Sequence, residues 1–433
     1  MELINDNSKN DMKTIYFRMA GAAVITAVMM ASCSDVVDIP QHDPYASNGA
    51  PVIEAIYDAQ DASATPQVIT GGVLNQMIKI KGKNLSHVKS ISFNGLEVDV
   101  RHAAYAERDF CNVTIPRKIP EEVTNKLVYT TEQGSVTMDF PVNIPNLQLD
   151  GLKNEFTLQG DKVQVMGDYF DLYGFSKDEE LNTATITIHN DDLGYSEVIP
   201  TDSITETYMG ILIPKDAPDN SLITFEWDGM DGRKTKTIPY RMSDQLMFSN
   251  MDGDLGWWND WLKSQLTWGG NSGDPKCLGY QFIRLQKNQD LSSSIIGSWS
   301  WNSTGMGCNW RWLDASANPE KYVLKFEVCT ASSKPFYNYG DNGKAGSRNG
   351  GYMITLNGGA TRNQWDPVSD GLNNTYGEWQ TISLPLVDCL GGSVLPTEPD
   401  QWVSLEFVCQ PNSNDDWQID HSFGQFRIEP AEY

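Results

Sequence analysis

An internal repeat constrains the fold of this chain more than any other feature of its sequence. Residues 77–85 alternate apolar and polar side chains up to Gly82, and residues 163–170 repeat the pattern with Gly167, 85 positions later. In each copy a later strand candidate ends in a proline, and a further strand candidate closes the unit. Short alternating strands that are interrupted by Gly and Pro are typical of small antiparallel β-sandwiches. The sequence therefore predicts two such sandwiches in tandem.

The two copies resemble the IPT/TIG immunoglobulin-like modules of secreted proteins. The resemblance rests on a strand followed by Gly-x-Asn/Tyr-Leu/Phe, and on a second strand, residues 91–95, that ends in Asn-Gly. The first copy carries both features, whereas the second has lost the Asn-Gly turn. We expect the modules to span residues 51–145 and 146–246. Modules of this kind mostly serve as spacers, and neither copy shows clustered aromatics in its sequence, so a spacer role is expected for both.

The last 188 residues (246–433) differ from the rest in their aromatic content. They hold 12 of the 13 tryptophans but one of the five histidines, His421. Strand candidates recur here, at residues 278–285, 310–313, 322–329, 352–356, 379–386, 402–409 and 423–429. In the third candidate the apolar side chains share one face, and Lys325 and Glu327 share the other, which is typical of a half-buried antiparallel strand. We therefore expect an all-β chain that ends in a jelly-roll sandwich over residues 247–433, long enough to fold alone.

Three segments of this region resemble the sugar-binding domain of Bacteroidetes surface glycan-binding lipoproteins of the SGBP-B type. They are YVLKFEV, EWQTISLPL and DHSFGQFRI, at residues 322–328, 378–386 and 420–428. The resemblance implies that the protein captures a polysaccharide at the cell surface, beside a TonB-dependent SusC-like transporter and its SusD-like partner. A neutral β-linked plant glucan, such as xyloglucan, is expected, because flat uncharged rings suit its sugar faces.

The candidate binding site consists of aromatic residues and a few hydrogen-bonding neighbours, because aromatic rings bury a large area at low conformational cost. The candidate glycan-binding residues are Trp301, Trp310, Trp312, Phe336, Tyr337, Tyr339, Arg362, Gln364 and Trp365. Trp310 and Trp312 point the same way if their segment is extended, although core packing explains such a pair equally well. Tyr337 and Trp365 lie in polar sequence surroundings, so exposure is expected for both. Trp379 and Phe426 are expected in the core.

Residues 1–32 carry the pattern of a bacterial lipoprotein signal peptide. A basic stretch precedes an apolar run, residues 19–31, which is too short to span a bilayer. Small residues directly before Cys33 resemble a lipobox, in which this cysteine becomes the acylated N-terminus. An ordinary signal peptide with an incidental cysteine is the alternative. Both Met1 and Met12 stay open as the start.

Residues 33–50 are polar, contain proline and show no periodicity, so we expect a flexible tether between anchor and body. The acidic residues that follow Cys33 are similar to the surface-export signal of Bacteroidetes lipoproteins. We therefore expect the protein at the outer membrane, on the cell surface, lipid-anchored through Cys33.

The net charge and the spacing of the cysteines argue against a nucleic acid partner and against a zinc site. The formal net charge is −25, which disfavours a nucleic acid partner, since phosphate neutralisation needs basic surface. The six cysteines after Cys33 show no C-x-x-C spacing, so a zinc site is not expected, but one disulfide among the five C-terminal cysteines stays open. No cofactor is expected. A structural calcium ion held by Asp252 and Asp420 is the weaker alternative.

An enzymatic function is the less favoured interpretation. A glycosidase needs two carboxylates across a cleft, one with a raised pKa, and nothing in the sequence marks such a pair. G-x-S-x-G and H-E-x-x-H are absent, and the single histidine of the last 188 residues argues against a histidine-based triad. A non-catalytic glycan-binding role is therefore expected. The alternatives are a lipid-anchored adhesin or structural surface protein and, less favoured, a surface glycoside hydrolase.

Overall fold

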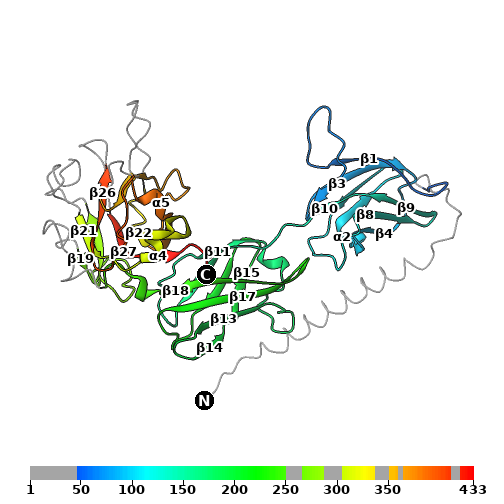
Figure 1. Cartoon of the computed structure of the whole chain (residues 1–433). Helices are drawn as coiled ribbons and strands as arrows, with labels where there is room; N and C mark the ends of the chain where they lie inside the picture. Colours follow the sequence, from blue (N-terminus) through cyan, green and yellow to red (C-terminus); the bar gives the residue numbers. More distant parts are fainter. Residues whose placement is uncertain (1–45, 250–265, 287–304, 337–350, 359–363, 411–419) are drawn as a thin grey trace, which may run out of the picture. The chain divides into compact units, whose positions relative to one another are not determined.

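The structure of the chain is a computed structural model, which describes residues 46–249, 266–286, 305–336, 351–358, 364–410 and 420–433 (Figure 1). Antiparallel strands dominate these residues, and the helices between them are short, which confirms the all-β prediction. The chain divides into two compact units, Met1–Pro116 with Pro120–Asn143, and Arg117–Ile119 with Ile144–Tyr433. No helix within the described ranges is long and apolar enough to cross a membrane.

The first unit is a sandwich of two four-stranded sheets. One sheet has the order β1-β3-β7-β6, formed by Val52–Asp58, Met77–Lys83, Phe110–Thr114 and Ala104–Ala106. The other has the order β5-β4-β8-β9, formed by Leu96–Glu97, Val88–Phe93, Lys126–Thr131 and Gly134–Asp139. A parallel pair, β10 (Val142–Asn143) with β2 (Gly72–Val73), and helix α2 (Val100–Ala103) lie beside them. Inward-facing side chains such as Ile80, Val113 and Tyr129 form one buried core.

The second unit begins with a sandwich of the same kind. One sheet has the order β11-β12-β16-β15, formed by Gln148–Leu152, Lys162–Asp168, Met209–Leu212 and Thr201–Ile204. The other has the order β14-β13-β17-β18, formed by Tyr195–Val198, Thr185–Asn190, Ser221–Gly229 and Gly232–Tyr240. Short 3-10 turns, η1 (Phe170–Leu172) and η2 (Ser243–Gln245), lie in its loops and at its end. Its core, around Ile188, Ile211 and Phe225, is separate from that of the first module.

The two repeated glycines have the same structural role. β3 and β12 each pair with the first strand of their module, and that partner strand is bulged beside the glycine in both modules. A Cβ on Gly82 would lie 1.9 Å from the carbonyl oxygen of Val52, and one on Gly167 would lie 2.1 Å from that of Gln148. Only glycine permits this backbone approach, which explains why the residue recurs.

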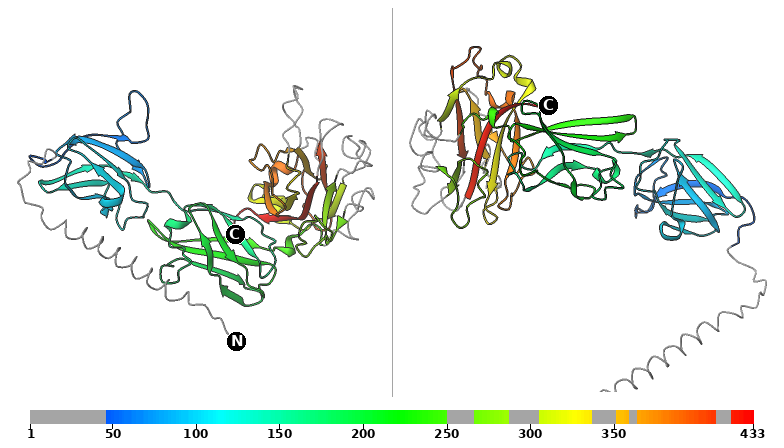
Figure 2. Two further views of the ribbon diagram at one scale, coloured as in Figure 1. Left: turned by 180° about the vertical axis from the view of Figure 1, so that it is seen from behind. Right: turned by 90° about the horizontal axis from the view of Figure 1, so that it is seen from below.

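Residues after 246 form a third sandwich, of a five-stranded and a four-stranded sheet (Figures 1 and 2). The five-stranded sheet has the order β19-β20-β27-β22-β25, formed by Leu266–Thr267, Phe282–Gln286, Asp420–Pro430, Tyr322–Thr330 and Gln380–Pro385. The four-stranded sheet has the order β21-β26-β23-β24, formed by Gly305–Asn309, Trp402–Gln410, Gly351–Leu356 and Gln364–Trp365. Helices α4 (Leu313–Ala317) and α5 (Leu386–Cys389) and the turn η3 (Pro319–Lys321) connect strands. Phe326 and Ile354 lie in the core between the sheets.

The structure corrects the sequence-based expectations for two segments of this sandwich. Residues 310–313 are not a strand, because β21 ends at Asn309 and helix α4 begins at Leu313. The strand β22 is buried on both faces, whereas alternation predicted a half-buried strand. Lys325 and Glu327 lie on its second face, where they are covered by the preceding module.

A cluster of buried charges joins the second module to the third sandwich within the second unit. The Glu155 carboxylate accepts hydrogen bonds from Lys325 Nζ at 2.7 Å and from Arg427 Nη2 at 2.6 Å. Arg427 also pairs with Glu327 at 3.0 Å and with Glu429 at 2.7 Å. An apolar cluster lies at the same junction and includes Phe156, Leu246, Leu278, Phe282, Cys329 and Trp379. The C-terminal strand β27 therefore contacts residues more than 250 positions earlier in the chain.

Candidate functional site

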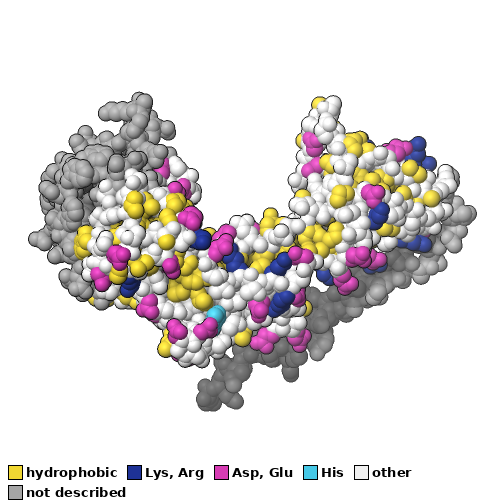
Figure 3. Space-filling view, in the orientation of Figure 1, with side chains coloured by type: hydrophobic (Ala, Val, Ile, Leu, Met, Phe, Trp, Pro, Cys, Tyr) yellow, Lys and Arg dark blue, Asp and Glu magenta, His cyan; other side chains and the backbone are white. Residues whose placement is uncertain are grey.

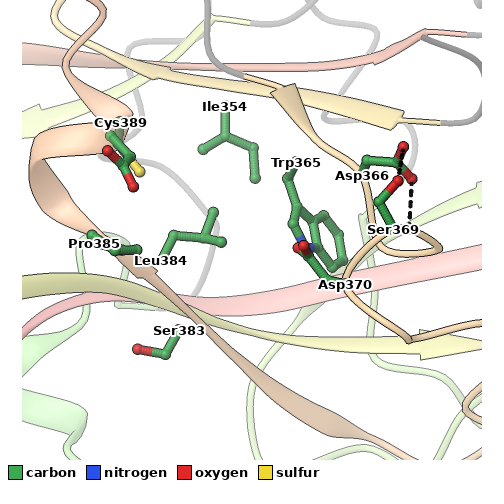
Figure 4. Close-up of a pocket in the computed structure, with 10 residues that line it drawn as sticks. Ile354, Trp365, Asp366, Ser369, Asp370, Ser383, Leu384, Pro385 and Cys389 are labelled. Atoms are coloured by element: carbon green, nitrogen blue, oxygen red, sulfur yellow. Dashed lines mark hydrogen bonds between the residues drawn. The ribbon is translucent and has the colours of Figure 1, made fainter.

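A cleft of about 730 Å³ lies at one edge of the third sandwich (Figure 4). Strands β23 and β24 of one sheet, β25 of the other and helix α5 supply its walls, with the loop that follows β24. The lining residues are Ile354, Trp365, Asp366, Ser369, Asp370, Ser383, Leu384, Pro385, Asp388 and Cys389. Ligand clefts have volumes of roughly 300–1,000 Å³, so a small ligand or a segment of a polymer fits.

Trp365 forms the inner wall of this cleft. Figure 4 shows its indole directed into the space from β24, opposite Leu384 of β25. The ring is 4% exposed because Trp365 pairs with Tyr352 in the register of β24 and β23, which turns both side chains to the core. Phe326 lies edge-on at 5.2 Å from it, and Phe336 at 5.8 Å. The expectation that Trp365 is exposed is therefore wrong, although the residue lines the cleft.

The polar part of the cleft consists of carboxylates and hydroxyls. Asp366 accepts hydrogen bonds from the Ser369 hydroxyl at 2.7 Å and from the Ser369 backbone N–H at 3.2 Å, which fixes the loop. Asp370 and Asp388 are exposed at the rim. Carboxylate oxygens accept hydrogen bonds and cannot donate them, and neither lysine nor arginine is among the described lining residues. The cleft therefore favours a neutral ligand rich in hydroxyl groups over an anionic one.

Trp310 and Trp312 are core residues, which corrects their assignment as exposed stacking rings. Their ring centroids are 5.1 Å apart, and both rings are buried. The indole N–H of Trp310 donates to the Ser316 hydroxyl, and that of Trp312 donates to Gln245 Oε1, each at 2.8 Å. Because Gln245 lies in η2, Trp312 fixes the chain segment that enters the third sandwich.

Phe336 is also buried, between His421 at 4.6 Å and Tyr352 at 6.1 Å. Gln364 lies in β24, where it pairs with Met353. Trp301, Tyr337, Tyr339 and Arg362 lie outside the described residues, so their place in a binding site stays a prediction. Trp379 and Phe426 are buried, which confirms their assignment to the core.

Asp420 is already paired with a cation of the chain itself. Its two carboxylate oxygens accept hydrogen bonds from Arg284 Nε and Nη2, each at 2.8 Å. Its proposed calcium partner, Asp252, lies outside the described residues. In the described ranges no group of three or more His, Cys, Asp or Glu side chains could hold a metal ion. Among the side chains that the structure describes, the free thiols are Cys111, Cys277, Cys308, Cys329 and Cys389.

Some exposed aromatic rings lie at positions that no sequence pattern predicts. Trp402, at the start of β26, is 41% exposed. A Cβ on Gly307 of the adjacent β21 would lie 2.1 Å from Trp402 Cζ2, so the indole covers this glycine. Trp268 and Tyr376 are exposed as well. The pairing of β21 with β26 places Trp402 over Gly307. Because the two residues are 95 positions apart in the sequence, no local pattern predicts this contact.

Two groups with displaced pKa values lie away from solvent. Burial raises the pKa of Glu327 to about 7, because its desolvation outweighs the positive charge of Arg427. Burial lowers the pKa of His421 to about 4, against the effect of its hydrogen bonds to backbone carbonyls. The His421 ring lies 2.5 Å from the Tyr352 hydroxyl and 3.0 Å from the carbonyl oxygen of Lys334. Both groups are buried, so substrate cannot reach either of them in this structure.

One family model matches the part of the chain that contains the third sandwich. A family model described as the surface glycan-binding protein B xyloglucan binding domain matches residues 240–430. The match includes β19 to β27, together with the end of β18 and η2, and therefore contains the Trp365 cleft.

Solved structures of similar organisation are distant in sequence. The surface glycan-binding protein PbSGBP-B from Prevotella bryantii is 18% identical, over 89% of this chain and 100% of its own, with a TM-score of 0.45. SGBP-B from a complex xyloglucan utilization locus in Bacteroides uniformis is 16% identical, over 88% and 99%, with a TM-score of 0.41. The SGBP-B of the Bacteroides ovatus mixed-linkage glucan utilization locus, in complex with a mixed-linkage heptasaccharide, is 10% identical, over 84% and 74%, with a TM-score of 0.25. These similarities are too low to say more about this chain. No curated protein matches it.

Proposed function

We propose that the protein is a non-catalytic glycan-binding protein, and that its C-terminal domain binds xyloglucan or a related neutral β-glucan in the Trp365 cleft. The observation that carries the proposal is the match of residues 240–430 to the xyloglucan-binding domain family. The cleft supports it, because its lining combines an aromatic and aliphatic wall with hydrogen-bond acceptors. Sugar rings present C–H groups to such a wall and hydroxyl donors to such acceptors.

The absence of catalysis is part of the proposal. Hydrolysis of a glycosidic bond requires a protonated carboxylic acid next to the scissile oxygen and a second carboxylate across the cleft. Glu327 has a pKa of about 7, but its side chain is fully buried at the junction with the second module. Asp366, in the cleft, is instead held by Ser369. A binding role accounts for this arrangement better than an acid–base role.

The cell-surface setting and the uptake partner are further parts of the proposal. The lipobox-like sequence before Cys33 and the tether that follows would anchor the protein in the outer membrane. A glycan captured there would be passed to a SusC/SusD-like transporter pair. The described acidic side chains of the face shown in Figure 3 are dispersed among neutral ones, which suits a neutral polymer better than an anionic one.

The proposal is tested by electrophoresis of the full chain through gels that contain one polysaccharide each. Xyloglucan and mixed-linkage β-glucan are expected to retard it, whereas polygalacturonate, an anionic control, is not. An assay for new reducing ends should stay at background after prolonged incubation. Released oligosaccharides would contradict the non-catalytic role, and unchanged migration with every neutral glycan would favour the adhesin alternative.

Variants at the rim test the location of the site. Asp370→Ala combined with Asp388→Ala removes two exposed acceptors without touching the core. Hydrogen bonds to charged groups contribute about 1.5–3 kcal/mol, so we expect at least a tenfold loss of affinity for xyloglucan by calorimetry. Glu320→Ala removes an exposed acid outside the cleft and serves as the matched control. Equal affinities in the double variant and the control would place the site elsewhere.

A further inference from the structure

A second cleft, of about 550 Å³, lies within the second unit, between the second module and the glycan-binding domain. The second module lines it with Lys153, Asn154, Thr157, Leu158, Asp161, Lys162, Val163, Gln164 and Tyr208, and the other wall consists of Lys276, Leu278, Gly377, Glu378 and Trp379. The two walls come from separate parts of the chain, residues 153–208 and residues 276–379, and no motif links them.

Direct contacts fix the two walls to each other. Lys153 Nζ lies 2.5 Å from Glu378 Oε2, and the carbonyl oxygen of Lys153 accepts a hydrogen bond from the Thr381 N–H at 2.8 Å. Lys276 pairs with Asp161 across the same cleft. The buried charge cluster around Glu155 begins two residues after Lys153. The cleft is therefore preformed, and a ligand would not have to order its walls.

Tyr208 is an aromatic residue that lines this cleft. Its side chain is 39% exposed, and it covers Gly210 on the same strand region. A Cβ on Gly210 would lie 2.7 Å from the Ser203 hydroxyl oxygen and 3.2 Å from the Tyr208 hydroxyl oxygen, so the glycine leaves room for both side chains. Gln164 pairs with Gly210 across β12 and β16, which puts its amide on the face where the ring lies. An aromatic ring beside a hydrogen-bonding amide is an arrangement that suits a sugar.

The charges that line the cleft are balanced by neighbouring side chains. Lys153 pairs with Glu378, Lys276 with Asp161, and Lys162 with Asp202 at 2.9 Å. A charged ligand would find no unmatched counter-charge among these described groups and would have to displace an existing partner. A neutral ligand with many hydroxyl groups can instead share hydrogen bonds with them.

We propose that this cleft is a second subsite for a neutral β-glucan chain, with one sugar stacked on Tyr208 and its hydroxyls bonded to Gln164. This inference rests on the proposed function, since it assigns the same class of ligand to a second place on the protein. It also gives the second module a part in binding, in contrast to the spacer role expected from its sequence. A polymer that occupies both clefts binds more tightly than either cleft alone allows, because the second contact is intramolecular.

The experiment is calorimetry of the full chain with a xyloglucan oligosaccharide and with xyloglucan polymer. We expect two oligosaccharides per chain for the wild type and one for Tyr208→Ala. Loss of a stacked ring costs roughly 5- to 150-fold in affinity, by analogy with bases on aromatic side chains, and polymer affinity should fall at least tenfold. Gln164→Ala should weaken the same site without removing a ring. Tyr105→Ala removes an exposed ring of the first module and is the matched control.

The outcomes separate this inference from the proposed function. Wild-type stoichiometry and affinity in both Tyr208→Ala and Gln164→Ala would overturn the second subsite while the proposed function stands. Loss of the Trp365-cleft site in the Asp370→Ala, Asp388→Ala variant, with one oligosaccharide still bound through Tyr208, would support both. A wild type that binds no neutral glycan would overturn both. As a control, the melting temperature of each variant is measured. A value equal to that of the wild type would show that the loss of binding is not caused by unfolding.

Discussion

Glu155 is expected to stabilise the glycan-binding domain although it belongs to the module before it. Desolvation opposes its ionisation, but the charges of Lys325 and Arg427 outweigh this effect and lower the pKa of Glu155. Its backbone is engaged too, since its N–H donates to the Thr381 hydroxyl at 2.8 Å. Glu155→Ala would remove the carboxylate from between two buried cations and leave this backbone contact in place.

The structure sets the magnitude of the effect. Removal of one partner from a buried ion pair typically costs about 3–5 kcal/mol. We expect the loss for Glu155→Ala to be at the lower end of this range, because both cations keep other acidic partners. Lys325 still pairs with Glu429 at 3.1 Å, and Arg427 still pairs with Glu327 and Glu429. The loss of the Glu155 charge also favours ionisation of Glu327, since Glu155 raises the pKa of Glu327. We expect a loss of about 3 kcal/mol, and a fall of roughly 6–12 °C in melting temperature.

Tryptophan fluorescence during urea unfolding is the appropriate assay. All 13 tryptophans lie at or after position 227, so the signal reports the second unit and not the first module. Glu179→Ala, which removes an exposed acid of the same module, is the matched control. If Glu155→Ala unfolds at the same urea concentration as the control, the cluster does not stabilise the domain and the reasoning fails. A double variant, Glu155→Ala with Glu327→Gln, should lose more than the sum of the single losses, because the compensating charge is gone.

Two further predictions concern pH and anchoring. Folded Glu327 keeps a proton that the unfolded chain releases above the ordinary carboxyl pKa of 4.5, so its contribution to stability should fall as pH rises from about 4.5 through about 7. Urea unfolding of the wild type and of Glu327→Gln at several pH values checks this prediction. The decline in the free energy of unfolding should be smaller in the variant. Buried His421 contributes in the opposite direction, but it is present in both proteins, so its effect cancels in the comparison. Cys33→Ala should move the protein from the membrane fraction to the soluble fraction of cells, and protease added to intact cells should remove the wild type. Wild-type protein that is protected in intact cells would place it on the periplasmic side.

Local sequence patterns predict the modules because the repeated features have local causes. Gly82 and Gly167 recur since each strand meets a bulged partner at a backbone distance that excludes a side chain. Alternation likewise predicts the inner face of β22 correctly. It fails for the outer face, where Lys325 and Glu327 look like solvent-facing residues, because the module that covers them is far away in sequence.

The candidate site was harder to predict than the fold. Polar neighbours in the sequence made Trp365 look exposed, but pairing with Tyr352 turns the ring inward. The polar residues around it form the rim of a cleft, so the segment stays a candidate site, whereas the expected exposure of its ring is wrong. Tyr208 cannot be predicted as a binding residue, because one tyrosine outside the aromatic-rich region carries no signal until β12 and β16 place it beside Gln164.

The buried junction limits where glycan can meet the C-terminal domain. Glu155 and Phe156 cover part of the outer face of the five-stranded sheet, around Lys325, Glu327 and Arg427, and that face cannot bind a polymer without separating the two modules. In residues 247–433 alone, Lys325 and Arg427 would lack Glu155 as a partner. Independent folding of this segment stays a prediction, and we expect it to be less stable than the same segment in the full chain. Accessible surfaces among the described residues include the Trp365 cleft at the sandwich edge, the cleft beside the junction, and the four-stranded sheet on which Trp402 covers Gly307. A glycan chain that reaches more than one of them would depend on the second module for its geometry, because that module fixes one wall of the second cleft.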